Sequence, residues 1–331
     1  MYLNKIRTYF RLGRIHSAVL TGLAPVCTAA ATGVTLSIYH YIELFLIGFL
    51  FHVYLFVLNE LQDVRVDKTS KDLKSKPLVD GSISVRGARA VVISSFALIL
   101  VLTPVFFLNK AIILIGISLV AFLLGWIYDS FGKKLPHADY PLSFMLFFVA
   151  LYGGFSVTTD FNPFVYIIAI LAFTQTLIQN IVAGLKDVDH DFITGGLSTS
   201  LRLRVRVKGE RLIVSKSFTA YVFFLKIAHI SLTVLPFVTG WIPYEKWQFY
   251  VIILLIAIAV VFMIRFLTIK IFNREKIMRA IGFHEMFTFM VIPILLAGFI
   301  GYVSALILIV LPVVWLGVFL VIMYGRLMPA I

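Results

Sequence analysis

The sequence predicts an all-α, polytopic membrane protein with nine or ten transmembrane helices. Of its 331 residues, 61% are hydrophobic and 14% are charged, a balance foreign to soluble domains. Apolar runs of about 20 residues recur along the chain, the length that crosses the hydrocarbon core of a bilayer. Because that core offers no water to backbone N–H and C=O groups, the runs must be helices. We expect one integral-membrane domain over residues 1–331.

The predicted spans follow in order along the chain. Eight apolar runs lie at 16–36, 41–60, 88–107, 110–128, 141–158, 163–184, 217–240 and 247–271. A last run, 282–325, would measure about 65 Å as a single helix at 1.5 Å per residue. We therefore expect it to turn within residues 298–301, as two spans or as one span and an oblique half-helix.

The distribution of positive charge predicts the topology. A formal net charge of +13 could indicate nucleic-acid binding, but the cations alternate between successive connections, as in membrane proteins. They gather at the N-terminus, at 65–89, at Lys133 and Lys134, at 202–216 and at 265–279, whereas Lys110 and Lys246 are nearly alone between these regions. We expect a multi-pass protein of the cell membrane, with a cytoplasmic N-terminus, contacts to anionic lipid headgroups and no nucleic-acid partner.

The N-terminal segment argues against a cleaved signal peptide, and the cysteine content excludes an intrachain disulfide and cysteine-based metal sites. The first apolar run is long enough to span and lacks a clear cleavage site, so we do not expect a cleaved signal peptide. Cys27 is the single cysteine, which excludes an intrachain disulfide and a cysteine-based metal cluster. We interpret it as a core residue.

Two stretches with carboxylates four residues apart are the main functional signal. The first holds Asn59, Asp63 and Asp67, and the second holds Asp187 and Asp191. Residues four apart share one face of a helix, so each stretch presents a column of oxygen ligands at the end of a predicted span. Each also opens a long connection, at about 62–87 and 186–216, of the kind that forms lids or binding loops. The charge distribution predicts that both stretches and their loops lie on the cytoplasmic side.

The ligand chemistry of these columns suits Mg²⁺, which takes oxygen ligands and is often shared with substrate phosphates. Two opposed columns could hold two or more Mg²⁺ ions with an anion between them. The cations that could share the anion's charge are Arg14, Lys76, Lys133, Lys134 and Lys186. A diphosphate leaving group needs such charges as it departs. The alternative for either stretch alone is a solvated helix end, and for each lysine an interfacial anchor. Asp189 faces away from Asp187 and Asp191 and is interpreted as an ordinary solvated residue, as is Asp139.

The motifs resemble those of the UbiA superfamily of intramembrane prenyltransferases. The family pattern N-x-x-x-D-x-x-x-D matches residues 59–67, and D-x-x-x-D matches residues 187–191 with Lys186 before it. The segment 76–84 is similar to the family's R-P-x-x-x-G-x-I-S, and Arg14 stands where the family has an arginine. Tyr128, followed by Lys133 and Lys134, resembles a third element. Lysines replace the commoner arginines near 74–76, which keeps charge but weakens bidentate phosphate binding.

The resemblance implies a UbiA-like fold, with helices around a central cavity capped by the two long loops. It also implies an enzyme that transfers an isoprenyl group, within the membrane, from geranyl, farnesyl or geranylgeranyl diphosphate. Asp63, Asp67, Asp187 and Asp191, with Asn59, would bind two or more Mg²⁺ ions that bridge the diphosphate. Its other contacts would be Arg14, Lys76, Tyr128, Lys133, Lys134 and Lys186.

Two classes of molecule could accept the isoprenyl group. An aromatic quinone precursor is the first expectation, and a glycerol phosphate ether lipid of the archaeal type is the second. A different class, the ion-coupled transporter, would use Asp63 and Asp187 as cation or proton sites. Transporters place such acids near the bilayer midplane, however, and these acids stand at predicted helix ends.

Overall fold

Helices make up nearly all of the regular structure. The computed structural model describes residues 2–68, 74–132, 135, 137–160 and 162–327. Within those residues, nine helices are long and apolar enough to cross a membrane. This confirms the predicted all-α, multi-pass architecture. The chain divides into two compact units.

The candidate spans agree closely with the predicted runs. Across the described residues they cover Ile38–Arg65, Val85–Phe106, Leu108–Phe131, Asp139–Val157, Phe164–Lys186, Lys216–Thr239, Lys246–Leu267, Arg274–Ile300 and Tyr302–Tyr324. The predicted first run is a shorter apolar helix, Ile15–Ala30. The last run does turn as expected, because Gly301 adopts a φ of 79° between two helices. Glycine reaches this region without the steric cost that a Cβ imposes.

The first unit comprises Met1–Ser130, Phe148–Phe161 and Leu306–Ile331. Its elements are α1 (Tyr2–Leu12), η1 (Ile15–Ser17), α2 (Ala18–Ala30), α3 (Ile38–Asp67), α4 (Val85–Phe106), η2 (Leu108–Lys110), nearly all of α5 (Ala111–Phe131), the second half of α6 (Asp139–Val157) and most of α14 (Tyr302–Tyr324). Helix α3 packs against both α2 and α4. The helix that contains the first acidic stretch therefore lies between two other helices of this unit.

A small apolar cluster holds the connection after α3 against that helix. Its buried members include Val57 on α3 and Leu78 and Ile83 in the connection. Gly81 has a φ of 77°, which turns the chain between the two connection residues. Ser84 then caps α4 by accepting a hydrogen bond from the Gly87 N–H. This packing places the segment that carries Lys76 beside the end of α3.

Helices α2 and α6 approach so closely that their backbones touch. A Cβ added to Gly153 would lie 1.7 Å from the carbonyl oxygen of Pro25. The hydroxyl of Thr28 donates a hydrogen bond to the carbonyl of Ala150, across the same pair of helices. Only glycine at residue 153 permits this contact.

Replacing Gly153 with alanine should therefore destabilise the protein. The added methyl group must push two helices apart, and such overpacking costs about 1–3 kcal/mol. We expect a lower melting temperature in detergent for G153A. The matched control is G116A, where an added Cβ meets nothing within 4 Å. An equal fall in both variants would contradict the close-contact interpretation, since alanine is the better helix former.

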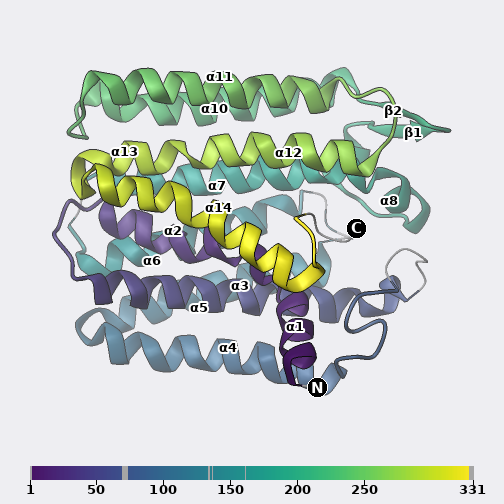
Figure 1. The fold of residues 1–331 in the computed structure, drawn as a ribbon, viewed down its shortest axis with the longest axis horizontal. Coiled ribbons are helices and arrows are strands. Elements are labelled where there is room, and N and C mark those ends of the chain that lie inside the picture. The colour runs from purple at the N-terminus through teal and green to yellow at the C-terminus, as the bar shows by residue number, and fades with distance from the viewer. Residues whose placement is uncertain (1, 69–73, 133–134, 136, 161, 328–331) are drawn as a thin grey trace. The chain divides into compact units, whose positions relative to one another are not determined.

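The second unit comprises Phe131–Phe147 and Asn162–Ala305. Besides the first half of α6, it holds α7 (Phe164–Ala183), η3 (Gly184–Lys186), α8 (Val188–Thr194), α9 (Thr199–Arg202), β1 (Arg206–Lys208), β2 (Arg211–Ile213), α10 (Lys216–Thr239), α11 (Lys246–Leu267), α12 (Arg274–Phe289) and α13 (Val291–Ile300). Helices α7, α10, α11 and α12 lie side by side (Figure 1).

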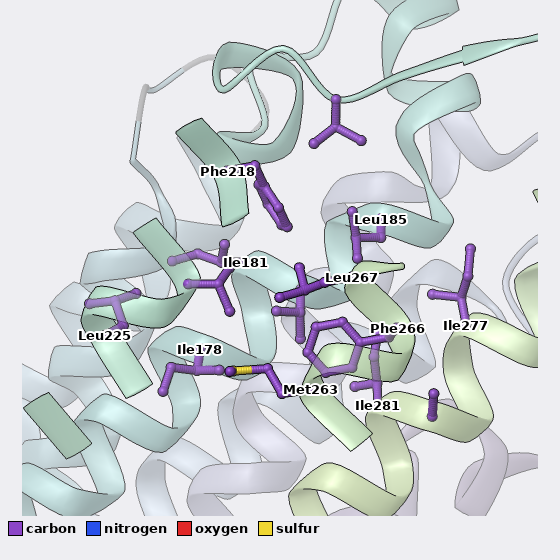
Figure 2. Packing of buried hydrophobic residues seen from close by; sticks show 14 of the residues in the cluster. Ile178, Ile181, Leu185, Phe218, Leu225, Met263, Phe266, Leu267, Ile277 and Ile281 are labelled. Atoms are coloured by element: carbon purple, nitrogen blue, oxygen red, sulfur yellow. The ribbon is translucent and has the colours of Figure 1, made fainter. Parts of the chain in front are cut away.

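These four helices enclose a packed apolar core (Figure 2). Phe218 of α10, Phe266 of α11 and Ile277 of α12 are fully buried there. The core continues beyond α7, where Leu185 of η3 and Val188 of α8 are also buried. Because these two residues lie on either side of Asp187, the core fixes the start of the second acidic stretch within this unit.

A hairpin follows that stretch. Strands β1 and β2 pair antiparallel, with Val207 opposite Leu212. The N–H of Leu212 also donates to the carbonyl of Lys270, and the N–H of Phe272 donates to the carbonyl of Glu210. The long connection at 186–216 is thus tied to the segment that precedes α12.

Candidate active site

The first acidic stretch lies on a single helix. Helix α3 continues through Asp67, so Asn59, Asp63 and Asp67 follow one another at one-turn intervals on one face. This confirms the helical column predicted from their spacing. Asp67 ends the helix and is buried, with 4% of its surface exposed.

A buried glutamate, Glu60, organises the cations around this column. One of its oxygens, Oε1, lies 2.8 Å from Nη2 of Arg14 and 3.1 Å from Nζ of Lys76. Lys76 also lies 2.8 Å from Oδ2 of Asp67. Arg14 and Lys76, which the sequence predicted as phosphate contacts, are therefore held together beside the first column. Glu60 was not among the predicted site residues.

Backbone geometry holds Arg14 in place as well. It adopts a left-handed conformation, with a φ of 46°, at the break between α1 and η1. Its carbonyl accepts a hydrogen bond from the Ser17 hydroxyl, and its guanidinium lies 5.2 Å from the centroid of the Phe56 ring. The contact with the ring face is a cation–π interaction.

Electrostatics within this cluster favour a charged arginine and an easily protonated aspartate. Burial works to lower the pKa of Arg14, but the Glu60 carboxylate, helped by Tyr324 and Tyr128, offsets it and the net shift is upward. Burial raises the pKa of Asp67, and the hydrogen bond from Lys76 opposes that rise only in part. A second cation beside Lys76 would therefore stabilise the charged form of Asp67, as a bound metal ion stabilises a carboxylate ligand.

The third predicted element contributes Tyr128 and an acid that sequence reasoning missed. Asp129 follows Tyr128 near the end of α5, and its Oδ1 accepts a hydrogen bond of 3.0 Å from Nδ2 of Asn59. A contact to the first column thus comes from a second helix of the same unit. The other two members of this element, Lys133 and Lys134, lie outside the described residues.

The second acidic stretch straddles a helix break. Sequence reasoning placed it at the end of a continuous helix, but α7 ends at Ala183 and a 3₁₀ turn, η3, follows. Asp187 then occupies the N-cap position of α8. The Asp191 N–H donates to the Asp187 carbonyl at 2.8 Å, so the two residues still stand one turn apart. Lys186 Nζ lies 3.1 Å from Asp187 Oδ2, and both side chains are partly exposed.

Arg274 anchors this stretch to the start of α12. Its Nη2 donates to both oxygens of Asp189, each at 3.0 Å, and its Nε donates to the Lys186 carbonyl at 3.1 Å. Asp189 had been interpreted as an ordinary solvated residue because it points away from the column. The structure corrects this, since Asp189 is the anchor through which α12 holds the turn.

Asp139, also interpreted as a solvated residue, has a structural partner too. Its Oδ2 accepts a hydrogen bond of 2.5 Å from the Thr199 hydroxyl. Thr199 begins α9, the short helix after the second stretch, and Asp139 begins α6. The segments on both sides of α8 therefore have contacts with other helices of this unit.

Loss of the Arg274 anchor should impair catalysis without unfolding the protein. We expect R274M to lower the rate of product formation about tenfold, as typical for groups that orient metal ligands. D189N should behave similarly, and the double variant should be little worse than either, because both remove one interaction. The control is K276M, an exposed lysine on the same helix. Additive losses would show that the two residues act separately.

The donor set fits Mg²⁺ only as a partial coordination shell. Among the described residues, no three histidine, cysteine or acidic side chains converge closely enough to hold a metal by themselves. Each stretch offers oxygen atoms without soft ligands, which suits Mg²⁺. An ion held by one or two carboxylates completes its shell with waters and substrate phosphates. The chemistry of the residues therefore fits a metal that arrives with its phosphate ligand.

Comparison with known proteins shows the family to which the chain belongs. The model of the UbiA prenyltransferase family matches residues 18–291, most of the chain. The chain belongs to the UbiA prenyltransferase family. This confirms the resemblance found in the motifs, and the family is one of prenyltransferases.

Curated relatives of this UbiA-family chain have two different names. Digeranylgeranylglyceryl phosphate synthase of Saccharolobus solfataricus is 29% identical over 199 residues, which cover 56% of this chain and 65% of that protein. The 4-hydroxybenzoate octaprenyltransferase of Yersinia enterocolitica is 29% identical over 150 residues, 44% of this chain and 49% of that protein. The chain thus matches less than two thirds of the length of either relative.

Solved structures confirm the UbiA-like fold. A digeranylgeranylglyceryl phosphate synthase structure aligns with a TM-score of 0.65 at 20% identity, covering 90% of this chain and all of that one. A UbiA homolog from Archaeoglobus fulgidus, bound to DMAPP and Mg²⁺, aligns with a TM-score of 0.61 at 21% identity, covering 86% and 99%.

Proposed function

We propose that this protein transfers an isoprenyl group from a prenyl diphosphate to a lipophilic or aromatic acceptor within the membrane. The observation that carries the proposal is the first cluster, in which Glu60 holds Arg14 and Lys76 beside the column of Asn59, Asp63 and Asp67. Acids that suit a metal and cations that suit a phosphate lie together there. Membership of the UbiA family supports the same reaction.

Each group in the clusters has a separate role in this proposal. Mg²⁺, when bound, would neutralise the diphosphate and favour its departure. The acids of both stretches, Asp63, Asp67, Asp187 and Asp191 with Asn59, would hold that metal. Arg14, Lys76 and Lys186 would carry the remaining phosphate charge, with Tyr128, Lys133 and Lys134 as the sequence predicts. Loss of diphosphate leaves an allylic cation, which the acceptor attacks before a proton departs.

The acceptor belongs to one of two classes that the relatives name. Sequence reasoning favoured an aromatic quinone precursor, and the Yersinia relative is a 4-hydroxybenzoate octaprenyltransferase. The longer match is to a digeranylgeranylglyceryl phosphate synthase, which supports the ether-lipid alternative. Both classes therefore enter the test. The family favours transfer over the ion-coupled transport considered from the sequence.

The test uses purified protein in nanodiscs. Labelled geranyl, farnesyl or geranylgeranyl diphosphate is supplied with Mg²⁺ and either 4-hydroxybenzoate or a prenylated glycerol phosphate, and products are identified by mass. We expect one acceptor class to be prenylated and EDTA to stop the reaction. Absence of any prenylated product with both acceptors would contradict the proposal.

We also propose that the N-terminus and both acidic stretches face the cytoplasm, as the charge distribution predicts. In a C27S background, G209C in the β1–β2 turn should react with a membrane-impermeant maleimide only from the cytoplasmic side. T159C, between α6 and α7, should react only from the opposite side. Both residues are exposed. Labelling of both from one side would refute this orientation.

A further inference from the structure

Asp129 carries a buried carboxylate oxygen that has no hydrogen-bond partner among the described residues. Its Oδ1 accepts the hydrogen bond from Asn59, whereas its Oδ2 is buried and makes no hydrogen bond. Leaving a buried polar atom unsatisfied costs about 1–3 kcal/mol, and more for a charged group. An apolar residue at this place would avoid that cost. Packing alone therefore does not explain an acid here.

The chemistry of the Asn59 amide supplies an explanation. An amide has one end that donates, the NH₂ group, and one end that accepts, the oxygen. Oδ1 of Asp129 accepts from the NH₂ group of Asn59, so the NH₂ end of the amide faces Asp129. The opposite end, Oδ1 of Asn59, is then the one left for a cation. A metal binds this oxygen and is repelled by the NH₂ group.

We propose that Asp129 is a positioning residue that fixes the Asn59 amide with its oxygen presented as a metal ligand. The inference deepens the proposed function and rests on it. Outer groups that orient metal ligands in this way commonly change metal affinity by about 10–100-fold when removed. Because Oδ2 of Asp129 is buried and makes no hydrogen bond to a described residue, the hydrogen bonding of this carboxyl group is incomplete in the protein alone. A water of the bound metal is the kind of donor that would complete it.

The test compares D129L, D129N and S130A for their Mg²⁺ requirement in prenyl transfer. D129L cannot accept a hydrogen bond, so the Mg²⁺ concentration for half-maximal rate should rise about tenfold or more. D129N retains an accepting oxygen and should show a smaller rise. S130A, the neighbouring polar residue on α5, should match the wild type. Because Asp129 acts through Asn59, adding D129L to N59A should cause little further loss.

Binding of Mn²⁺, followed by electron paramagnetic resonance in the presence of prenyl diphosphate, gives a readout independent of turnover. D129L should bind Mn²⁺ about tenfold more weakly than S130A. Unchanged Mg²⁺ and Mn²⁺ affinities in a folded D129L protein would overturn the inference, as would losses that add in the N59A/D129L variant. If the wild type binds Mn²⁺ but transfers no prenyl group, the proposed function fails while the positioning role is still decided by binding.

Discussion

Replacing both Asp63 and Asp187 with alanine should abolish prenyl transfer. Both residues are proposed metal ligands; Asp63 lies on α3 and Asp187 is the N-cap of α8. Removing a group that stabilises charge in the transition state typically lowers the rate by about 100–1000-fold. We expect at least the lower figure, measured as initial rate at saturating prenyl diphosphate and Mg²⁺.

The single variants test whether the two stretches serve one diphosphate. If they do, D63A and D187A should each lose nearly as much rate as the double variant, because groups that act as a unit are not additive. The control is D160A, an exposed aspartate in the α6–α7 connection. Size-exclusion profiles in detergent should be unchanged in all four variants. Normal transfer by the double variant would remove these residues from the site.

The sequence predicted the architecture well because span length and charge placement are local properties. Runs of about 20 apolar residues became helices at nearly the expected places. The turn in the last run was also predicted, since residues 298–301 include the glycine that adopts a positive φ. The first column was predicted correctly for the same reason, because α3 is a regular helix through residue 67.

The residues that sequence reasoning missed depend on contacts between distant segments. Glu60 precedes Asp63 by three residues and falls outside the four-residue pattern, and its partners Arg14 and Lys76 lie 46 and 16 positions away. Periodicity within one helix carries no information about such partners.

Asp189 and Asp129 show the same limit. Asp189 was set aside because it points away from its column, yet that direction is where Arg274 meets it. Asp129 follows Tyr128 in a matched motif, but its contact to Asn59 spans 70 positions. Spacing within a helix therefore predicts the proposed metal ligands, whereas the partners of Asp189 and Asp129 are found only from the packing of distant segments.

Replacing Glu60 with glutamine should weaken both the fold and the site. Glu60 is 4% exposed and brings Arg14 and Lys76 to the same oxygen atom. Glutamine keeps the shape but not the charge, so Arg14 and Lys76 lose the anion that they share, and Lys76 keeps only Asp67. A hydrogen bond to a charged partner contributes about 1.5–3 kcal/mol. We expect E60Q to lose stability of that order, seen as a lower melting temperature in detergent.

An anion that binds between Arg14 and Lys76 should reverse part of this loss. If these two side chains contact diphosphate, added inorganic diphosphate with Mg²⁺ should raise the melting temperature of E60Q more than that of the wild type. A ligand that binds only the folded protein stabilises it by mass action, and in E60Q it also supplies the missing negative charge. The matched control is E43Q, near the opposite end of α3. Destabilisation of E60Q that diphosphate leaves unchanged would mean that Glu60 supports the fold alone and that its two cations do not meet the substrate.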